Sequence, residues 1–255
     1  MKINRRLIAI GLGGLAVLAG VLVVIVSLSR TTLEIRELVV TGESDARAVA
    51  DVRRAVQAEL TGGFFSQDLD AIKQAVERLT WVKSATVARV WPDSISVTVT
   101  RLDPVARWED GRLVSREGIV FMPLVEEGGK TALLPLVLAD TVEYAPEAIR
   151  FLKRFEEIAA KARARVQSVA VSYRGSWTVT LTMPRGTALR IELGRAVSSD
   201  AVFERMQLVL DYYYKQVCET LRGCPSFVDA RYENAFAARW PNSQFESNEN
   251  PQKGR

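Results

Sequence analysis

The chain has 255 residues, with 34 lysine and arginine residues, 30 aspartate and glutamate residues, and no histidine. The absence of histidine excludes Ser-His-Asp and Cys-His catalysis and every metal site that needs imidazole. All 30 acids follow residue 30, while four bases lie in residues 1–30, so the rest of the chain has 30 bases against 30 acids. This neutral balance, without a clustered basic face, excludes a nucleic-acid partner.

An uncharged run from Leu7 to Leu28 is the first element of the chain. As a helix it would span about 33 Å, close to the hydrocarbon thickness of a bilayer. The alternative is a cleaved signal peptide, because Ser27-Leu28-Ser29 loosely resembles a cleavage site, but the apolar region of such peptides is only about 7–15 residues long. Residues 1–6 carry three bases and no acid, which predicts a cytoplasmic N-terminus and an extracytoplasmic C-terminal part.

A first domain with the order β-α-α-β-β is expected over residues 33–101. Alternation predicts a strand at residues 33–40, and apolar residues three or four apart then predict two helices. Ser66 is expected to cap the second helix. Two further strands, at residues 82–91 and 94–101, should complete a small sheet with helices on one face.

A second, mixed β domain is expected over residues 104–240. Asp110-Gly111 predicts a tight hairpin, and Pro146 is a favourable first residue for an amphipathic helix. A further helix should carry Val202 and Met206 on its apolar face. The strands expected in this domain cover residues 105–108, 113–114, 119–121, 166–173, 177–183, 189–193, 227–232 and 235–240. Residues 241–255 are polar and charged, which predicts a disordered tail.

The chain contains two cysteines, Cys218 and Cys224. An oxidising compartment would allow them to close a small disulfide loop, and otherwise they are free thiols. Two cysteines do not build a tetrahedral metal site by themselves. In either state their expected role is structural.

Motifs that could indicate catalysis have simpler structural explanations. Trp91-Pro92-Asp93 could be an acid-catalyst loop, but proline and aspartate are typical turn residues. Glu126-Glu127 and Glu156-Glu157 are expected to be solvated carboxylates in a loop and on a helix. Gly62-Gly63 lacks the lysine and the preceding strand of a phosphate loop. The sequence therefore predicts neither an enzyme nor a cofactor.

The last predicted strand, residues 235–240, carries one charge and precedes the polar tail. An edge strand can recruit a partner strand through its unpaired N–H and C=O groups. The alternative is an interior or covered strand, because exposed edges favour aggregation. Binding through this strand is thus one of two interpretations that the residues allow.

Several short motifs follow one another in a set order along the whole chain. They are Leu38-Val39-Val40-Thr41-Gly42, Trp81-Val82-Lys83-Ser84-Ala85-Thr86-Val87, Arg89-Val90-Trp91-Pro92-Asp93-Ser94, Pro104-Val105-Ala106-Arg107-Trp108, Leu113-Val114 with Gly118-Ile119-Val120-Phe121, Leu193-Gly194-Arg195, Val228-Asp229-Ala230-Arg231-Tyr232 and Trp240. Together they resemble the FtsQ/DivIB family of bacterial cell-division proteins. Two positions depart from the family pattern: Thr80 replaces a common proline, and Ala235 replaces a frequent glycine.

The resemblance implies an α+β protein with a single N-terminal transmembrane helix, a POTRA domain over residues 33–101, and a mixed β domain over residues 104–240 ending in strands with an available edge. It further implies a non-catalytic divisome scaffold, in the bacterial inner membrane at the septum, with a periplasmic C-terminus. The expected partners are FtsB and FtsL, and the expected role links early cytoplasmic division proteins to septal peptidoglycan synthesis. The alternative is a POTRA-type periplasmic chaperone or assembly factor for envelope proteins.

In the family, an FtsB segment adds as a strand to the last strand of the β domain. The partner contacts expected here are Arg195, Arg231, Tyr232, Asn234, Ala235, Phe236 and Trp240. The two arginines would suit carboxylates on the partner, since guanidinium groups bind them in a bidentate manner. The two large aromatic residues would supply buried anchors of the interface.

Overall fold

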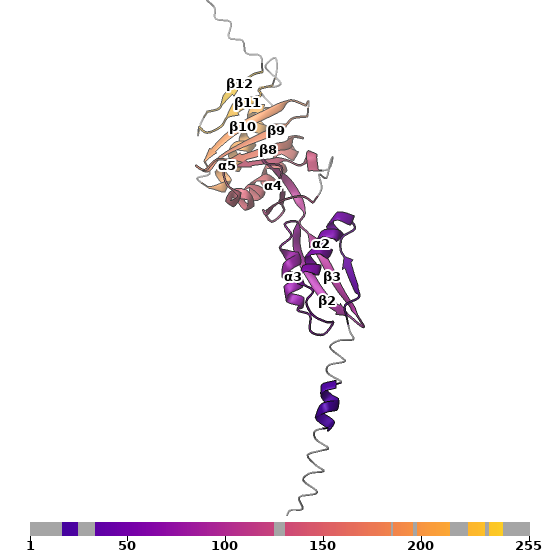
Figure 1. Ribbon diagram of the computed structural model, residues 1–255. Coiled ribbons are helices and arrows are strands. Elements are labelled where there is room, and N and C mark those ends of the chain that lie inside the picture. Colours follow the sequence, from indigo (N-terminus) through magenta and orange to yellow (C-terminus); the bar gives the residue numbers. More distant parts are fainter. Residues whose placement is uncertain are drawn as a thin grey trace, which may run out of the picture. The chain divides into compact units, whose positions relative to one another are not determined.

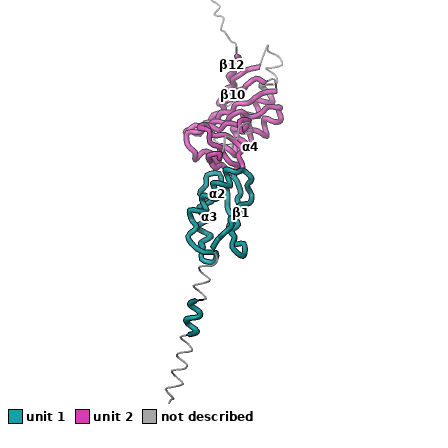
Figure 2. The backbone as a smooth tube through the Cα atoms, turned by 45° about the vertical axis from the view of Figure 1, so that its right-hand side comes forward, with its two compact units in different colours: residues 1–102 teal, residues 103–255 magenta. Residues whose placement is uncertain are grey.

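The computed structural model describes residues 17–24, 34–124, 131–184, 186–195, 198–214, 224–232 and 235–241. Residues 17–24 are helical, while the rest of the predicted anchor, the stub at 1–6 and the tail from residue 242 lie outside the described residues. No helix in the described ranges combines the length and the apolar character needed to cross a membrane. The chain divides into two compact units, residues 1–102 and 103–255, which are coloured separately in Figure 2.

Unit 1 has the β-α-α-β-β order that the sequence predicts. Its elements are β1 (Glu37–Thr41), α2 (Ala46–Glu59), α3 (Leu69–Glu77), β2 (Val82–Val90) and β3 (Ser94–Arg101). The sheet order is β1-β3-β2, in which β3 runs parallel to β1 and antiparallel to β2. The central strand β3 buries Ile95, Val97 and Val99, because alternate residues of a strand share one face.

The start of α3 differs from the prediction. Asp68, not Ser66, is the N-cap residue, and its Oδ1 accepts hydrogen bonds from the N–H groups of Asp70 (2.9 Å) and Ala71 (3.1 Å). The Ser66 hydroxyl instead accepts from the Gly63 N–H at 3.0 Å. The preceding turn holds Ser66, so the carboxylate two residues later caps the helix.

Unit 2 contains a nine-stranded mixed sheet (Figure 1). Its strands are β4 (Pro104–Trp108), β5 (Leu113–Ser115), β6 (Val120–Phe121), β7 (Leu136–Ala139), β8 (Arg165–Val171), β9 (Ser176–Thr182), β10 (Ala188–Arg195), β11 (Phe227–Asp229) and β12 (Ala237–Arg239). The spatial order is β12-β11-β10-β9-β8-β7-β4-β5-β6. The first strands of unit 2, β4 to β6, therefore lie at one end of the sheet, and its last strand, β12, forms the opposite edge.

Strand β7 was not predicted from the sequence. It lies between β4 and β8 and pairs in parallel with both. Its four residues are too few to show a period of their own, and its partners are distant in the sequence. Its place in the sheet is therefore a property of tertiary pairing.

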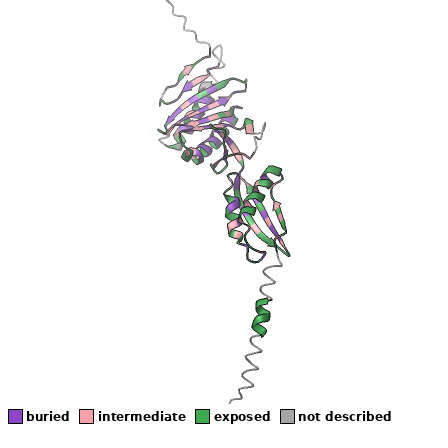
Figure 3. Ribbon diagram, in the orientation of Figure 1, coloured by how far each residue is buried: buried purple, intermediate pink, exposed green. Residues whose placement is uncertain are grey.

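Two helices cover one face of this sheet, α4 (Ala145–Lys161) and α5 (Ser199–Leu208), and α5 continues as the π-helical turn η3 (Val209–Tyr214). Short 3-10 turns, η1 (Thr131–Leu133) and η2 (Val142–Tyr144), flank β7. The ring of Phe151 on α4 stacks on Trp177 of β9 with centroids 3.9 Å apart. Buried residues of the helices and of the central strands are purple in Figure 3.

Candidate partner-binding edge

The residues expected to contact a partner gather at one end of the nine-stranded sheet. Arg195 ends β10, Arg231 and Tyr232 follow β11, and Ala235, Phe236 and Trp240 flank β12. Asn234 lies outside the described residues. Among the described strands β12 pairs with β11 alone, so it is an edge strand. We call residues 235–240 the C-terminal edge.

Within the described residues, the backbone of β12 pairs with another strand on one side only. The Arg239 carbonyl accepts a hydrogen bond from the Ser226 N–H (2.9 Å) and therefore faces β11. Successive residues of a strand direct their backbone groups to opposite sides. The N–H and C=O of Ala238 thus point away from β11, to the side where no described strand pairs.

The side chains of the C-terminal edge alternate between the core and the solvent. Phe236 and Ala238 are half-buried and pack against the hydrophobic core, whereas Ala237 and Arg239 are exposed. The Arg239 guanidinium lies over the ring of Phe227, 5.3 Å from its centroid. These contacts hold β12 on β11 from both faces of the strand, while no described strand pairs with its outer edge.

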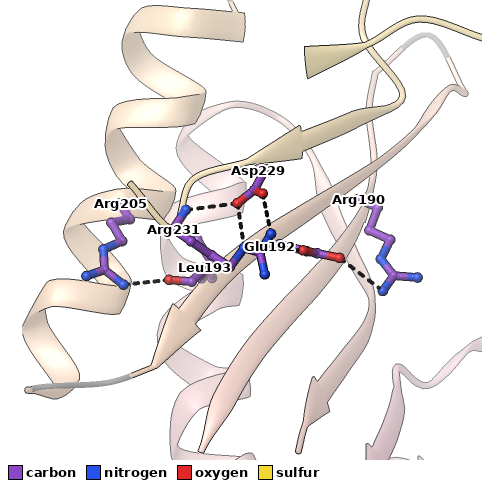
Figure 4. A network of polar contacts seen from close by, with 6 residues as sticks. All are labelled: Arg190, Glu192, Leu193, Arg205, Asp229 and Arg231. Carbon is purple, nitrogen blue, oxygen red and sulfur yellow. Dashed lines mark hydrogen bonds and ion pairs between the residues drawn. The ribbon is translucent and has the colours of Figure 1, made fainter. Parts of the chain in front are cut away.

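Arg231 is the centre of a polar network beside this edge (Figure 4). Its Nε and Nη2 donate to the two carboxylate oxygens of Asp229, at 2.9 and 2.6 Å. The Arg231 backbone N–H also donates to Asp229 Oδ1 (3.1 Å). Glu192 on β10 lies 3.6 Å from Arg231 Nε and 3.5 Å from Arg190. The fork of Arg231 is therefore bound by Asp229 of the same chain, and 52% of the arginine side chain remains exposed.

The contact between Asp229 and Arg231 favours the charged form of each side chain. The hydrogen bonds from Arg231 lower the pKa of the nearly buried Asp229 carboxyl, despite the opposing effect of burial. The same contact raises the pKa of Arg231 above its usual value. The ion pair is therefore intact at neutral pH, which fixes the direction of the arginine side chain.

Gly194 and Arg205 shape the end of β10 next to this pair. The pairing register with β9 shifts between Glu192 and Gly194, and Gly194 has φ +74°. A Cβ at this glycine would lie 3.0 Å from Cγ of Arg231. Arg205 on α5 donates to the carbonyls of Leu193 (2.6 Å) and Arg195 (3.2 Å). Because residue 194 has no side chain, the side chain of Arg231 has room to lie against β10 at this position.

The sequence reasoning did not single out Asp229, Glu192 or Arg205. For Asp229 the sequence does contain a local indication of an ion pair. Arg231 stands two residues later, and residues two apart on a strand lie on the same face. Glu192 and Arg205 carried none, since their contacts depend on the pairing of β10 with β11 and on the packing of α5. The supporting residues of the site are therefore found from the tertiary structure.

The two expected aromatic anchors differ in exposure. Tyr232 is 57% exposed, while Trp240 is half-buried at the end of the C-terminal edge. A large aromatic side chain exposed beside an open strand edge is typical of an interface residue. Cys224, shortly before β11, is disulfide-bonded, and Cys218 lies outside the described residues.

Two family models match consecutive parts of the chain. Residues 33–100 match the POTRA domain of FtsQ type, and residues 106–231 match the C-terminal part of the cell division protein FtsQ/DivIB. The second match includes Arg195 and Arg231 and stops before the C-terminal edge. Neither description is that of an enzyme family.

Similar proteins named cell division protein FtsQ cover most of the chain. The protein of Burkholderia pseudomallei is 32% identical over 219 residues, which are 86% of this chain and 84% of that protein. That of Allochromatium vinosum is 32% identical over 214 residues, 84% of this chain and 81% of the other. That of Escherichia coli is 29% identical over 212 residues, 82% of this chain and 73% of the other. The chain therefore belongs to the FtsQ/DivIB family of cell-division proteins, and its first unit contains a POTRA domain.

Proposed function

We propose that the protein is a non-catalytic scaffold of the divisome, which binds FtsB by adding an FtsB strand to β12. FtsL belongs to the same complex in this proposal. The observation that carries it is the side of β12 on which no described strand pairs, where the backbone groups of Ala238 point away from β11. Strand addition uses such groups for affinity and neighbouring side-chain contacts for specificity.

The side chains around the edge suit different parts of such an interface. Tyr232 and Trp240 would bury aromatic surface against the partner, where hot-spot residues are commonly found. Arg195 would meet acidic groups of the partner. Arg231 has its fork occupied by Asp229, so a partner carboxylate would approach its Nη1 side.

The same proposal includes the membrane topology. Residues 1–6 would be cytoplasmic, residues 7–28 would cross the inner membrane, and the POTRA domain (33–101) and β domain (104–240) would lie in the periplasm at the septum. The charge asymmetry around the apolar run supports this orientation. The protein would then link cytoplasmic early division proteins to septal peptidoglycan synthesis.

Replacing Ala238 by proline tests the strand-addition step. Proline removes only the outward N–H of this residue, because the bonds to β11 come from its neighbours. We expect A238P to weaken the binding of an FtsB ectodomain peptide by roughly tenfold or more, which corresponds to about 1.4 kcal/mol. Binding is measured by calorimetric titration of the full-length protein in detergent.

Ala238→Ser is the matched control, since it keeps the N–H and a small side chain. Both variants should retain the near-ultraviolet circular dichroism and the unfolding midpoint of the wild type. Wild-type affinity in A238P would contradict addition at β12. Tyr232→Lys and Trp240→Lys should also weaken binding, and they test the side-chain contacts separately from the backbone.

A further inference from the structure

Three large apolar side chains are exposed at one end of unit 1. Trp91, in the turn between β2 and β3, is 79% exposed, and Phe65, in the connection between α2 and α3, is 65% exposed. Val90, the last residue of β2, is exposed as well. Single exposed apolar residues are common, but two aromatic residues from separate loops at the same end are less so.

Arg89 ties these two loops together. Its Nε donates to the Phe64 carbonyl (2.7 Å), and its Nη2 donates to the carbonyls of Gln67 (2.6 Å) and Phe65 (3.4 Å). The connection that carries Phe65 is thus fastened to the strand that leads into Trp91. The two loops are therefore fixed to each other at this end of unit 1, and we call their exposed apolar residues Phe65, Val90 and Trp91 the aromatic tip.

The aromatic tip lies where the chain arrives from the apolar run. The Arg36 N–H, just before β1, donates to the Asp93 carbonyl in the β2–β3 turn (2.9 Å). The parallel register confirms this, because Glu37 stands beside Ser94. The start of the folded unit and the β2–β3 turn therefore share one end, the lower end of unit 1 in Figure 1.

The sequence limits how far this end can be from the apolar run. Eight peptide steps separate Leu28 from Arg36. Fully extended, they reach at most about 29 Å, and any compaction shortens this distance. If residues 7–28 span the bilayer, this reach keeps Arg36 within about 29 Å of the membrane surface. The aromatic tip at the same end then has a high local concentration at the headgroups.

We infer that the aromatic tip docks on the membrane, with Trp91 and Phe65 in the headgroup layer of the bilayer that holds the anchor. Tryptophan is enriched at this interface because its ring is apolar and its N–H is polar. The exposed charges nearby are mixed, with Arg36 between Glu34 and Glu37, so they give no net attraction to anionic lipids. The contact is therefore apolar and interfacial, and it does not depend on anionic headgroups.

This inference rests on the anchor in the proposed function, and one preparation tests both. The full-length protein is reconstituted into phosphatidylcholine vesicles, and flotation after a carbonate wash reports the anchor. Tryptophan fluorescence is then compared between vesicles with and without lipids brominated near the headgroup end of the acyl chain. The emission of Trp91 is the difference between the emission of the wild type and that of Trp91→Phe in vesicles without bromine. We expect the brominated lipid to quench at least half of this difference.

A second variant keeps the reporter and removes the rest of the tip. Phe65→Ser combined with Val90→Ser should reduce the quenching of Trp91 at least twofold. Leu133→Ser in unit 2, where the leucine is 86% exposed, is the matched control and should leave it unchanged. Protein that floats but shows the same quenching in wild type and Trp91→Phe would overturn the inference and leave the anchor intact. Protein that does not float would overturn both.

Discussion

Single side chains decide which groups are available to a partner beside the C-terminal edge. Arg231 is a charged residue of the kind that recognises acidic groups, yet its fork is bound by Asp229 and neighboured by Glu192. A guanidinium held in this way loses little side-chain freedom when a partner binds, which favours affinity. Its direction depends on Asp229 and on the space above Gly194.

Asp229→Asn should destabilise unit 2 in a pH-dependent manner. The pKa of Asp229 is lowered in the folded protein, so its contribution is present above the unfolded value, near 3.8, and is lost as the pH falls through the lower folded value. The difference in denaturant midpoint between wild type and D229N should therefore shrink from pH 7 to pH 3.

Asp110→Asn is the control for this comparison. Asp110 also has a lowered pKa, caused mainly by the Arg112 N–H, but it lies exposed in a turn. Its substitution should change the midpoint less at pH 7. A D229N difference that stays constant down to pH 3 would contradict the ionic role of Asp229.

Gly194→Ala should impair both stability and partner binding. Its φ of +74° is unfavourable for alanine by about 1–2 kcal/mol. The added methyl group would also displace Arg231, so the affinity for the FtsB peptide should fall. Gly175→Ala is a matched control, because Gly175 has φ +71° but no atom within 4 Å of the added Cβ. Equal affinities of the two variants would argue against a role of Arg231 placement.

Individual elements depend on local chemistry that the sequence shows only in part. The hydrophobic spacing predicted both helices of unit 1, but α3 begins at the residue after Asp68 and not after Ser66. The sequence offers two adequate capping residues, and the turn that uses Ser66 decides between them. Helix position is thus predictable from periodicity, while its first residue depends on the turn before it.

Asp68→Ala should cost about 1 kcal/mol of stability, a typical value for the loss of an N-cap. The reason is that two N–H groups of the first turn of α3 lose their acceptor. Ser66→Ala should cost less, since α3 does not use its hydroxyl. Urea unfolding followed by helical circular dichroism measures both, and the reverse order of the two variants would restore Ser66 as the cap.

At the scale of the whole molecule, the chain consists of two units with separate hydrophobic cores. The large core cluster lies entirely within residues 106–230, and the buried residues of α2, α3 and β3 form the core of unit 1. Separate cores favour separate folding units, since domains generally fold with their own core. The aromatic tip and the C-terminal edge therefore lie in different units.

Trp177→Ala should test this separation. It removes the stacking partner of Phe151 from the core of unit 2 and should cost about 3–5 kcal/mol. Hydrogen exchange followed by mass spectrometry should then show faster exchange in peptides of β8 to β10 and unchanged exchange in peptides of α2 and β3. A similar acceleration in unit 1 would show that the two units unfold together.

The sequence by itself determined the order of elements in unit 1, the presence of its two amphipathic helices, and the family resemblance that the comparisons confirm. These features follow from periodicity, capping residues and turn residues, which are local. The tertiary structure alone decided that β7 lies between β4 and β8, that β12 is outermost, and that Asp229 and Glu192 hold Arg231. Each of these depends on strands or side chains that meet across the sheet, and local propensity does not specify which distant segments pair.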